Sequence, residues 1–132
     1  ERIDAFSQPW QQAENEKLIL AIALKDSDLL IGELMLKITN VDSQVAEIGY
    51  RLAHEYQGQG FGFEATKALM DFGFSTLNLH KISALCVAEN SASSGLMKKL
   101  GMRLEGKLES HFKISDTWFD GLMFSRLNPA HG

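Results

Sequence analysis

The sequence contains few of the features that cross-link a fold or anchor it in a membrane. Cys86 is the only cysteine among 132 residues, so these residues hold no pair that could form a disulfide. No run of about 18 apolar residues occurs, and no charged segment followed by an apolar one opens the chain. Neither a membrane span nor secretion is indicated. Because Cys86 lies in the apolar stretch 82–87, we predict a buried thiol in a protein of the reducing cytoplasm.

Positive charge is also scarce. Lysine and arginine number 13 against 17 acidic residues, the net charge is -4, and no basic cluster occurs. This composition argues against a nucleic-acid partner and suits a cationic amine better. No repeat, low-complexity block or linker divides the chain. With 45% hydrophobic and 23% charged residues, it is predicted to form one soluble domain over residues 1–132.

Hydrophobic periodicity predicts a mixed α/β fold. Ile3, Phe6, Trp10 and Ala13 recur at helical spacing, which predicts a short helix interrupted near Pro9. The other expected helices cover residues 62–77, with positions 65, 69, 72 and 77 facing inward, and 91–100. The expected strands cover residues 18–24, 29–38, 45–53, 81–88, 104–114 and 118–127.

Three glycines alternate between an expected strand and an expected helix, in the segment Gln57-Gly58-Gln59-Gly60-Phe61-Gly62. Glycine lets backbone N–H groups approach a ligand closely, and the helix that follows adds positive potential at its first turn. A phosphate or pyrophosphate is the natural occupant. The dinucleotide pattern G-x-G-x-x-G fails at Phe63, and a P-loop match at 101–107 fails at Leu108, where a hydroxyl is needed.

The glycine segment instead fits [QR]-x-x-G-x-[GA], with further motifs on either side. Ala46-Glu47-Ile48-Gly49-Tyr50 precedes it, and Asn90-Ser91-Ala92-Ser93, Leu100-Gly101-Met102-Arg103-Leu104-Glu105-Gly106 and Trp118-Phe119-Asp120 follow. From about residue 18 to residue 127 the chain resembles the RimJ/RimL-like branch of the GNAT superfamily, whose members acetylate protein N-termini or small amines. The resemblance implies a mixed, mostly antiparallel sheet with flanking helices and a splay between strands 45–53 and 81–88.

The resemblance also implies acetyl-coenzyme A as co-substrate, with no metal. The amides of residues 57–62 would bind its pyrophosphate, and the exposed backbone of Tyr50, Arg51 and Leu52 would bind its pantetheine arm. The Leu52 amide would also donate to the oxyanion. Asn90 would cap the next helix, contact the pantetheine, or do both.

Acetyl transfer further requires groups that manage two protons. Met97 occupies the position where many relatives carry a tyrosine as general acid, and the resemblance implies Ser93 for this role; its hydroxyl could instead bond its own helix. Glu47 is the first candidate for the general base, although strand parity turns it to the opposite face unless a bulge intervenes. His111 and bulk water are the alternatives. Asp120 is expected to be structural.

The predicted reaction is direct attack of a primary amine on acetyl-coenzyme A, without a covalent intermediate on Cys86. The amine would be a protein N-terminal α-amine or a small molecule. A non-catalytic domain that binds or senses acyl-coenzyme A is the alternative, because Phe124, like Met97, stands where relatives carry a tyrosine. The strand and helix that open relatives are expected to be missing, so the domain is interpreted as N-terminally truncated. Relatives often form homodimers, and the sequence leaves the oligomeric state open.

Overall fold

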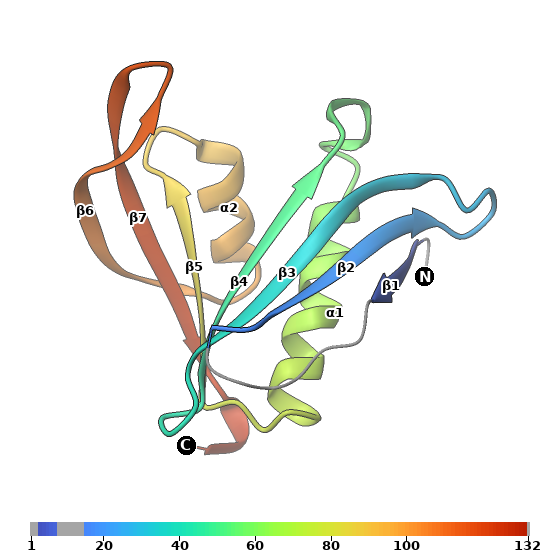
Figure 1. The fold of residues 1–132 in the computed structure, drawn as a ribbon, viewed down its shortest axis with the longest axis horizontal. Helices are drawn as coiled ribbons and strands as arrows, with labels where there is room; N and C mark the ends of the chain where they lie inside the picture. Colours follow the sequence, from blue (N-terminus) through green and yellow to red (C-terminus); the bar gives the residue numbers. More distant parts are fainter. Residues whose placement is uncertain (1–2, 8–14, 132) are drawn as a thin grey trace.

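The computed structural model describes residues 3–7 and 15–131, which form a seven-stranded sheet with two helices (Figure 1). The strands are β1 (Ile3–Ser7), β2 (Lys17–Leu24), β3 (Leu30–Asn40), β4 (Val45–Leu52), β5 (Lys81–Val87), β6 (Arg103–Ile114) and β7 (Thr117–Leu127). The helices are α1 (Phe61–Ser75) and α2 (Ser91–Lys99), with short 3₁₀ turns η1 (His54–Tyr56) and η2 (Pro129–His131). No helix in the described ranges is long and apolar enough to cross a membrane.

The sheet has the order β1-β2-β3-β4-β5-β7-β6. Its neighbouring strands are antiparallel except for β4 and β5, which are parallel because α1 connects them. The predicted mixed, mostly antiparallel α/β fold is confirmed.

Strand β1 shows that the predicted N-terminal helix is wrong where it can be compared. Ile3 and Phe6 lie in a strand that pairs antiparallel with β2, with Ile3 opposite Leu24. The edge of an existing sheet offers this short segment ready hydrogen-bond partners, whereas a single helical turn is costly to nucleate. Trp10 and Ala13, at the other end of the expected helix, lie outside the described residues.

Both helices pack on the same face of the sheet. A Cβ added to Gly62 of α1 would lie 3.4 Å from Leu52 Cδ1 and 3.5 Å from Tyr50 Cε2 on β4, and 3.7 Å from Leu96 Cδ2 on α2. On β4, Tyr50 and Leu52 alternate with residues that face the opposite side. As predicted, Ala46 and Ile48 share the face of Tyr50 and Leu52, and both are buried.

One inward position predicted for α1 is wrong. Ala65 and Leu69 are buried as expected, but Phe72 is 38% exposed. The buried stripe instead continues through Gly73 and Phe74. A Cβ at Gly73 would lie 3.0 Å from Ile82 Cδ1, so the helix approaches the sheet closely there and turns Phe72 outward.

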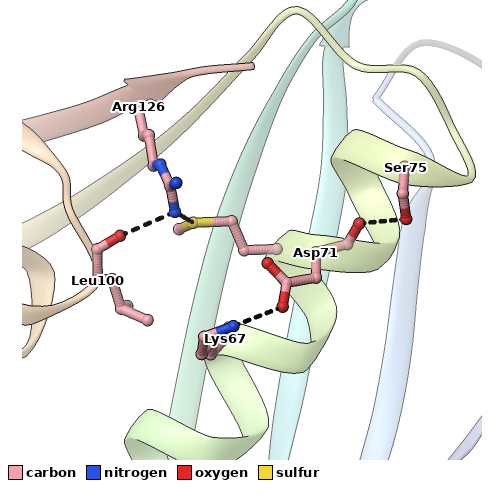
Figure 2. Close-up of polar contacts among 6 residues, drawn as sticks. Lys67, Asp71, Ser75, Leu100 and Arg126 are labelled. Carbon is pink, nitrogen blue, oxygen red and sulfur yellow. Dashed lines mark hydrogen bonds and ion pairs between the residues drawn. The ribbon is translucent and has the colours of Figure 1, made fainter. Parts of the chain in front are cut away.

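Arg126 links β7 to both helices (Figure 2). Its Nη1 donates to the Leu100 carbonyl at 3.3 Å, at the C-terminus of α2, and lies 3.8 Å from Met70 Sδ on α1. The guanidinium also lies 5.8 Å from the centre of the Phe74 ring. A cation at a helix C-terminus is favourable because the last carbonyls lack helical partners. This contact fixes the position of α2 relative to α1, and the candidate site lies between these two helices and β4.

Candidate active site

Strands β4 and β5 pair over three positions and then separate. The last pair is Glu47 with Ser83, and β5 continues beyond it paired with β7 on its other side. Figure 1 shows the two strands together at one end of the sheet and wide apart at the other. The predicted splay is confirmed, and it leaves the end of β4 with a free backbone edge.

That edge includes the N–H of Leu52. In an antiparallel pair, the N–H groups of successive residues point alternately toward the partner strand and away from it. Ala53 N donates to Ile31 O of β3 at 2.8 Å, so the N–H of Leu52 points away from β3, toward the gap. The Leu52 carbonyl, on the same side, accepts a hydrogen bond from Gln57 Nε2 at 3.2 Å. An amide pointing into a pocket is the type of donor that an oxyanion requires.

The glycine segment follows this edge and begins α1. Gly58 and Gly60 have φ angles of 74° and 86°, and Gly60 is the N-cap of the helix. This left-handed conformation costs other residues roughly 1–2 kcal/mol, which explains the two glycines. The first N–H groups of a helix have no helical partners, so the start of α1 can bind an anion.

The gap, the glycine segment and the two helices enclose a pocket of about 530 Å³, within the range of small-molecule sites. The predicted site residues that line it are Tyr50, Arg51, Leu52, Gln57, Gly58, Gly60, Gly62, Asn90 and Ser93. Two residues of the predicted loop do not line it. Phe61 is buried in the core, and the Gln59 side chain donates to the Glu55 carbonyl at 2.8 Å. Their contribution to binding is therefore limited to backbone amides.

The start of α2 forms the opposite wall. Asn90 caps the helix, since its Oδ1 accepts from Ser93 N at 3.1 Å, and it also lines the pocket. Ser93 Oγ lies 3.5 Å from Tyr50 Oη, whereas the neighbouring Ser94 is the residue whose hydroxyl bonds the helix, at Ser91 O. The Ser93 hydroxyl does not bond its own helix and can therefore contact a ligand in the pocket. Met97, by contrast, is buried in the core.

The sequence interpretation missed five of the pocket residues that belong to the helices. They are Phe63, Ala92, Gly95, Leu96 and Lys99. Those on α2 recur at intervals of three and four residues counted from Ala92, so a helical projection starting at Ala92 would have grouped them on one face. Lys99 Nζ lies 4.6 Å from the centre of the Phe63 ring, which places a cation at the wall of the pocket.

The two candidate bases lie on the face of the sheet opposite the helices. Glu47 alternates with buried residues of β4, and no register shift intervenes between it and Leu52. Glu47 therefore faces the side of the sheet opposite Leu52, as the strand alternation predicted. It belongs to the last paired position, five residues before Leu52, or roughly 17 Å along the strand. Direct proton transfer between Glu47 and an amine near the Leu52 amide is out of reach.

His111 lies nearer the open end of the gap. A Cβ at Gly121 would lie 3.4 Å from His111 Cβ, and Gly121 pairs with Val87, the last residue of β5. Because Glu47 pairs with Ser83, Val87 stands level with Arg51, next to Leu52. His111 therefore lies at the height of the Leu52 amide, on β6, with β5 and β7 between it and the gap.

An irregular segment of β6 produces this placement. Leu108 pairs with Gly121 and Phe112 with Phe119, so residues 109–111 face Asp120 alone. Ser110 has a φ of 47°, and its N–H donates to Asp120 Oδ1 at 2.8 Å. This bond is the main reason why the pKa of Asp120 is lowered, with a further contribution from Lys107. Asp120 thus holds a bulge, a feature that often redirects a side chain.

Cys86 is buried, as predicted. Burial raises the pKa of its thiol, which is the opposite of what a nucleophilic cysteine needs.

A glycine turn that begins a helix, beside a splayed strand pair, offers backbone donors and a free strand edge to an extended ligand. The chain belongs to the acetyltransferase (GNAT) domain family, whose model matches residues 1–103. It is 35% identical over 106 residues to the uncharacterized N-acetyltransferase YnaD of Bacillus subtilis, covering 80% of this chain and 62% of that protein. It is 39% identical over 70 residues to spermidine N(1)-acetyltransferase of Escherichia coli, covering 53% of this chain and 38% of that protein.

Solved structures agree with this assignment. A ribosomal-protein-S5-alanine acetyltransferase from Vibrio fischeri superposes with a TM-score of 0.80 at 28% identity, covering 86% of this chain and 62% of that one. The chain thus spans about three fifths of the length of the first relatives that it matches.

Proposed function

We propose that this domain transfers an acetyl group from acetyl-coenzyme A to a primary amine by direct attack, in the manner of the RimJ/RimL-like branch. The observation that carries the proposal is the pocket, which joins the glycine turn at the start of α1 to the free edge of β4. The amides of residues 57–62 would hold the pyrophosphate, and the edge from Tyr50 to Leu52 would pair with the pantetheine arm. The Leu52 N–H would then bind the developing oxyanion.

Direct transfer is favoured over a covalent intermediate because Cys86 is buried and the pKa of its thiol is raised. A buried single cysteine also suits the reducing cytoplasm, where we expect the protein to work. A ping-pong pattern in steady-state kinetics would contradict direct transfer.

We infer that the acceptor has a low pKa. A peptide α-amine, with a pKa near 7.7–8.0, is about a tenth neutral at pH 7, whereas a lysine near 10.4 is neutral about once in several thousand molecules. The gap of about 2.6 units corresponds to about 3.5 kcal/mol, which a strong base would have to supply. Glu47 is distant from the Leu52 amide, so the site favours a peptide N-terminus or a small amine of low pKa. Of the relatives, a ribosomal-protein alanine acetyltransferase is named for an α-amine, which is a low-pKa acceptor, whereas spermidine N(1)-acetyltransferase is named for an alkylamine whose pKa is closer to that of lysine.

The base itself is tested by matched amide substitutions. We expect His111→Gln to lower kcat/KM more than Glu47→Gln, because His111 stands level with the gap and Glu47 does not. Equal small effects of both substitutions would indicate that bulk water takes the proton.

Release of free thiol from acetyl-coenzyme A tests the function as a whole. The wild-type protein is assayed against peptides with free or blocked N-termini, polyamines and aminoglycosides, and binding is measured in parallel by calorimetry. We expect binding together with turnover of at least one amine. Binding without turnover across the panel would favour the alternative, a non-catalytic acyl-coenzyme A sensor, and efficient acetylation of internal lysines alone would contradict the low-pKa acceptor.

A further inference from the structure

The side chain of Tyr50, and not only its backbone, faces the candidate site. Tyr50 lies on β4 on the side of the helices, it is half-buried, and it lines the pocket. Its Oη lies 3.5 Å from Ser93 Oγ, which projects from the first turn of α2. Two hydroxyls from opposite walls therefore meet inside the pocket.

The distance between the two hydroxyl oxygens allows both groups to contact the same third atom. An ordinary O–H···O hydrogen bond is about 2.5–3.0 Å long, so 3.5 Å is a loose contact between the two oxygens. Two hydroxyls at this separation can both point at one acceptor placed beside them, at the corner of a nearly equilateral triangle. Within the described part of the chain, neither hydroxyl forms another hydrogen bond that would turn it away.

No other polar side chain around the pocket is as well placed to give up a proton there. Arg51 points outward, where its Nη2 binds Glu33 Oε1 at 2.9 Å with most of its side chain exposed. Asn90 is engaged as the cap of α2, and Lys99 lies over the Phe63 ring.

We propose that Tyr50 Oη is the proton donor to the leaving sulfur, with Ser93 Oγ as its partner in a two-hydroxyl site. This inference rests on the proposed acetyl transfer and deepens it. The amine nitrogen bonds to the thioester carbonyl carbon, the C–S bond breaks, and its electron pair stays on sulfur. The Tyr50 proton moves to that sulfur and gives a free thiol. Tyr50 regains a proton from solvent through Ser93, and the proton lost by the amine passes to a base or to water.

Tyr50→Phe removes one oxygen and keeps the ring, so packing against Gly62 is preserved. General acid catalysis typically contributes 10²–10⁴-fold, and we expect kcat to fall by about 10²-fold or more while the Kd for acetyl-coenzyme A changes less than about twofold. The basic limb of the pH profile of kcat, which reports loss of the donated proton, should shift or disappear. A merely structural tyrosine would not move that limb.

Ser93→Ala should lower kcat less than Tyr50→Phe does, and the double variant should be about as slow as Tyr50→Phe alone, because the two hydroxyls act as one unit. The chain offers matched controls. Tyr56→Phe alters the other tyrosine, which packs on Phe61, and Ser94→Ala removes the hydroxyl that bonds Ser91 O. Both controls should keep wild-type kcat.

If Tyr50→Phe keeps the wild-type kcat, whether or not Ser93→Ala lowers it, the assignment of Tyr50 is overturned and the proposed acetyl transfer stays intact. A wild-type protein that binds acetyl-coenzyme A but releases no thiol with any amine would overturn both proposals. The two failures are therefore distinguishable in one set of assays.

Discussion

Replacing Gly60 by aspartate and, separately, by asparagine tests whether the glycine turn binds an anion. Gly60 has a φ of 86° and lines the pocket at the N-cap of α1. Aspartate and asparagine have the same shape, and both tolerate left-handed backbone better than most residues. Each should therefore lose a similar roughly 1–2 kcal/mol of stability through the backbone. What differs between them is one negative charge beside the bound pyrophosphate.

The size of that difference follows from electrostatics. Two unit charges about 4 Å apart interact with about 1 kcal/mol in water and about 4 kcal/mol at an effective dielectric constant of 20. Because the pocket is partly open to solvent, we expect Gly60→Asp to bind acetyl-coenzyme A between about 5-fold and about 10³-fold more weakly than Gly60→Asn. The difference in affinity between the two variants should decrease as salt is added, since salt screens exposed charges.

Isothermal calorimetry at low and high salt measures both affinities, and thermal unfolding confirms that the two variants are equally folded. Equal affinities of the two variants at low salt would refute an anion at this turn. A large difference in affinity that does not change with salt concentration would instead indicate an altered loop conformation.

Two further predictions concern stability. The Ser110 N–H lowers the pKa of Asp120, so the ionised carboxylate stabilises the fold above its unfolded pKa of about 3.9. This contribution is lost as the pH falls through the lower folded value. Urea unfolding should therefore show Asp120→Asn less stable than wild type at pH 7, with the difference in stability shrinking below about pH 4. A Cβ at Gly32 would lie 2.1 Å from the Arg51 carbonyl oxygen, so Gly32→Ala should cost about 1–3 kcal/mol or more by pushing β3 from β4. In the same thermal melts Gly106→Ala is the control, because nothing lies within 4 Å of its added Cβ, and equal melting temperatures for these two variants would contradict the predicted clash.

The parts of the fold that were predicted well are those specified by neighbouring residues. The end of α2 is an example: Gly101 has a φ of 82°, and Met102 N donates to Met97 O, as a helix stopped by glycine requires. The glycine segment is another, since its backbone conformation depends on the residues themselves. Strand alternation on β4 likewise follows from local pattern, including the side on which Glu47 lies.

The parts that were predicted poorly depend on residues distant in sequence. The pairing of Ile3 with Leu24 turns a helical spacing into an edge strand, and nothing local to β1 signals it. Phe72 faces outward because α1 approaches Ile82 at Gly73. The contact of Tyr50 with Ser93 crosses 43 positions and requires both the splay of β4 and the cap of α2.

The same distinction separates the donor half of the site from the acceptor half. The proposed donor half is a continuous strand, turn and helix, in which Gly58 and Gly60 adopt the left-handed backbone that favours glycine. Under the proposed function, the acceptor half would include the β6 bulge, where three residues face Asp120 and place His111 over Gly121. A change in length or sequence of that bulge would move His111 without disturbing the glycine turn, so it can alter the choice of amine while leaving acetyl-coenzyme A binding unchanged. Under the proposed function, such independence would allow one donor site to be combined with different amine acceptors.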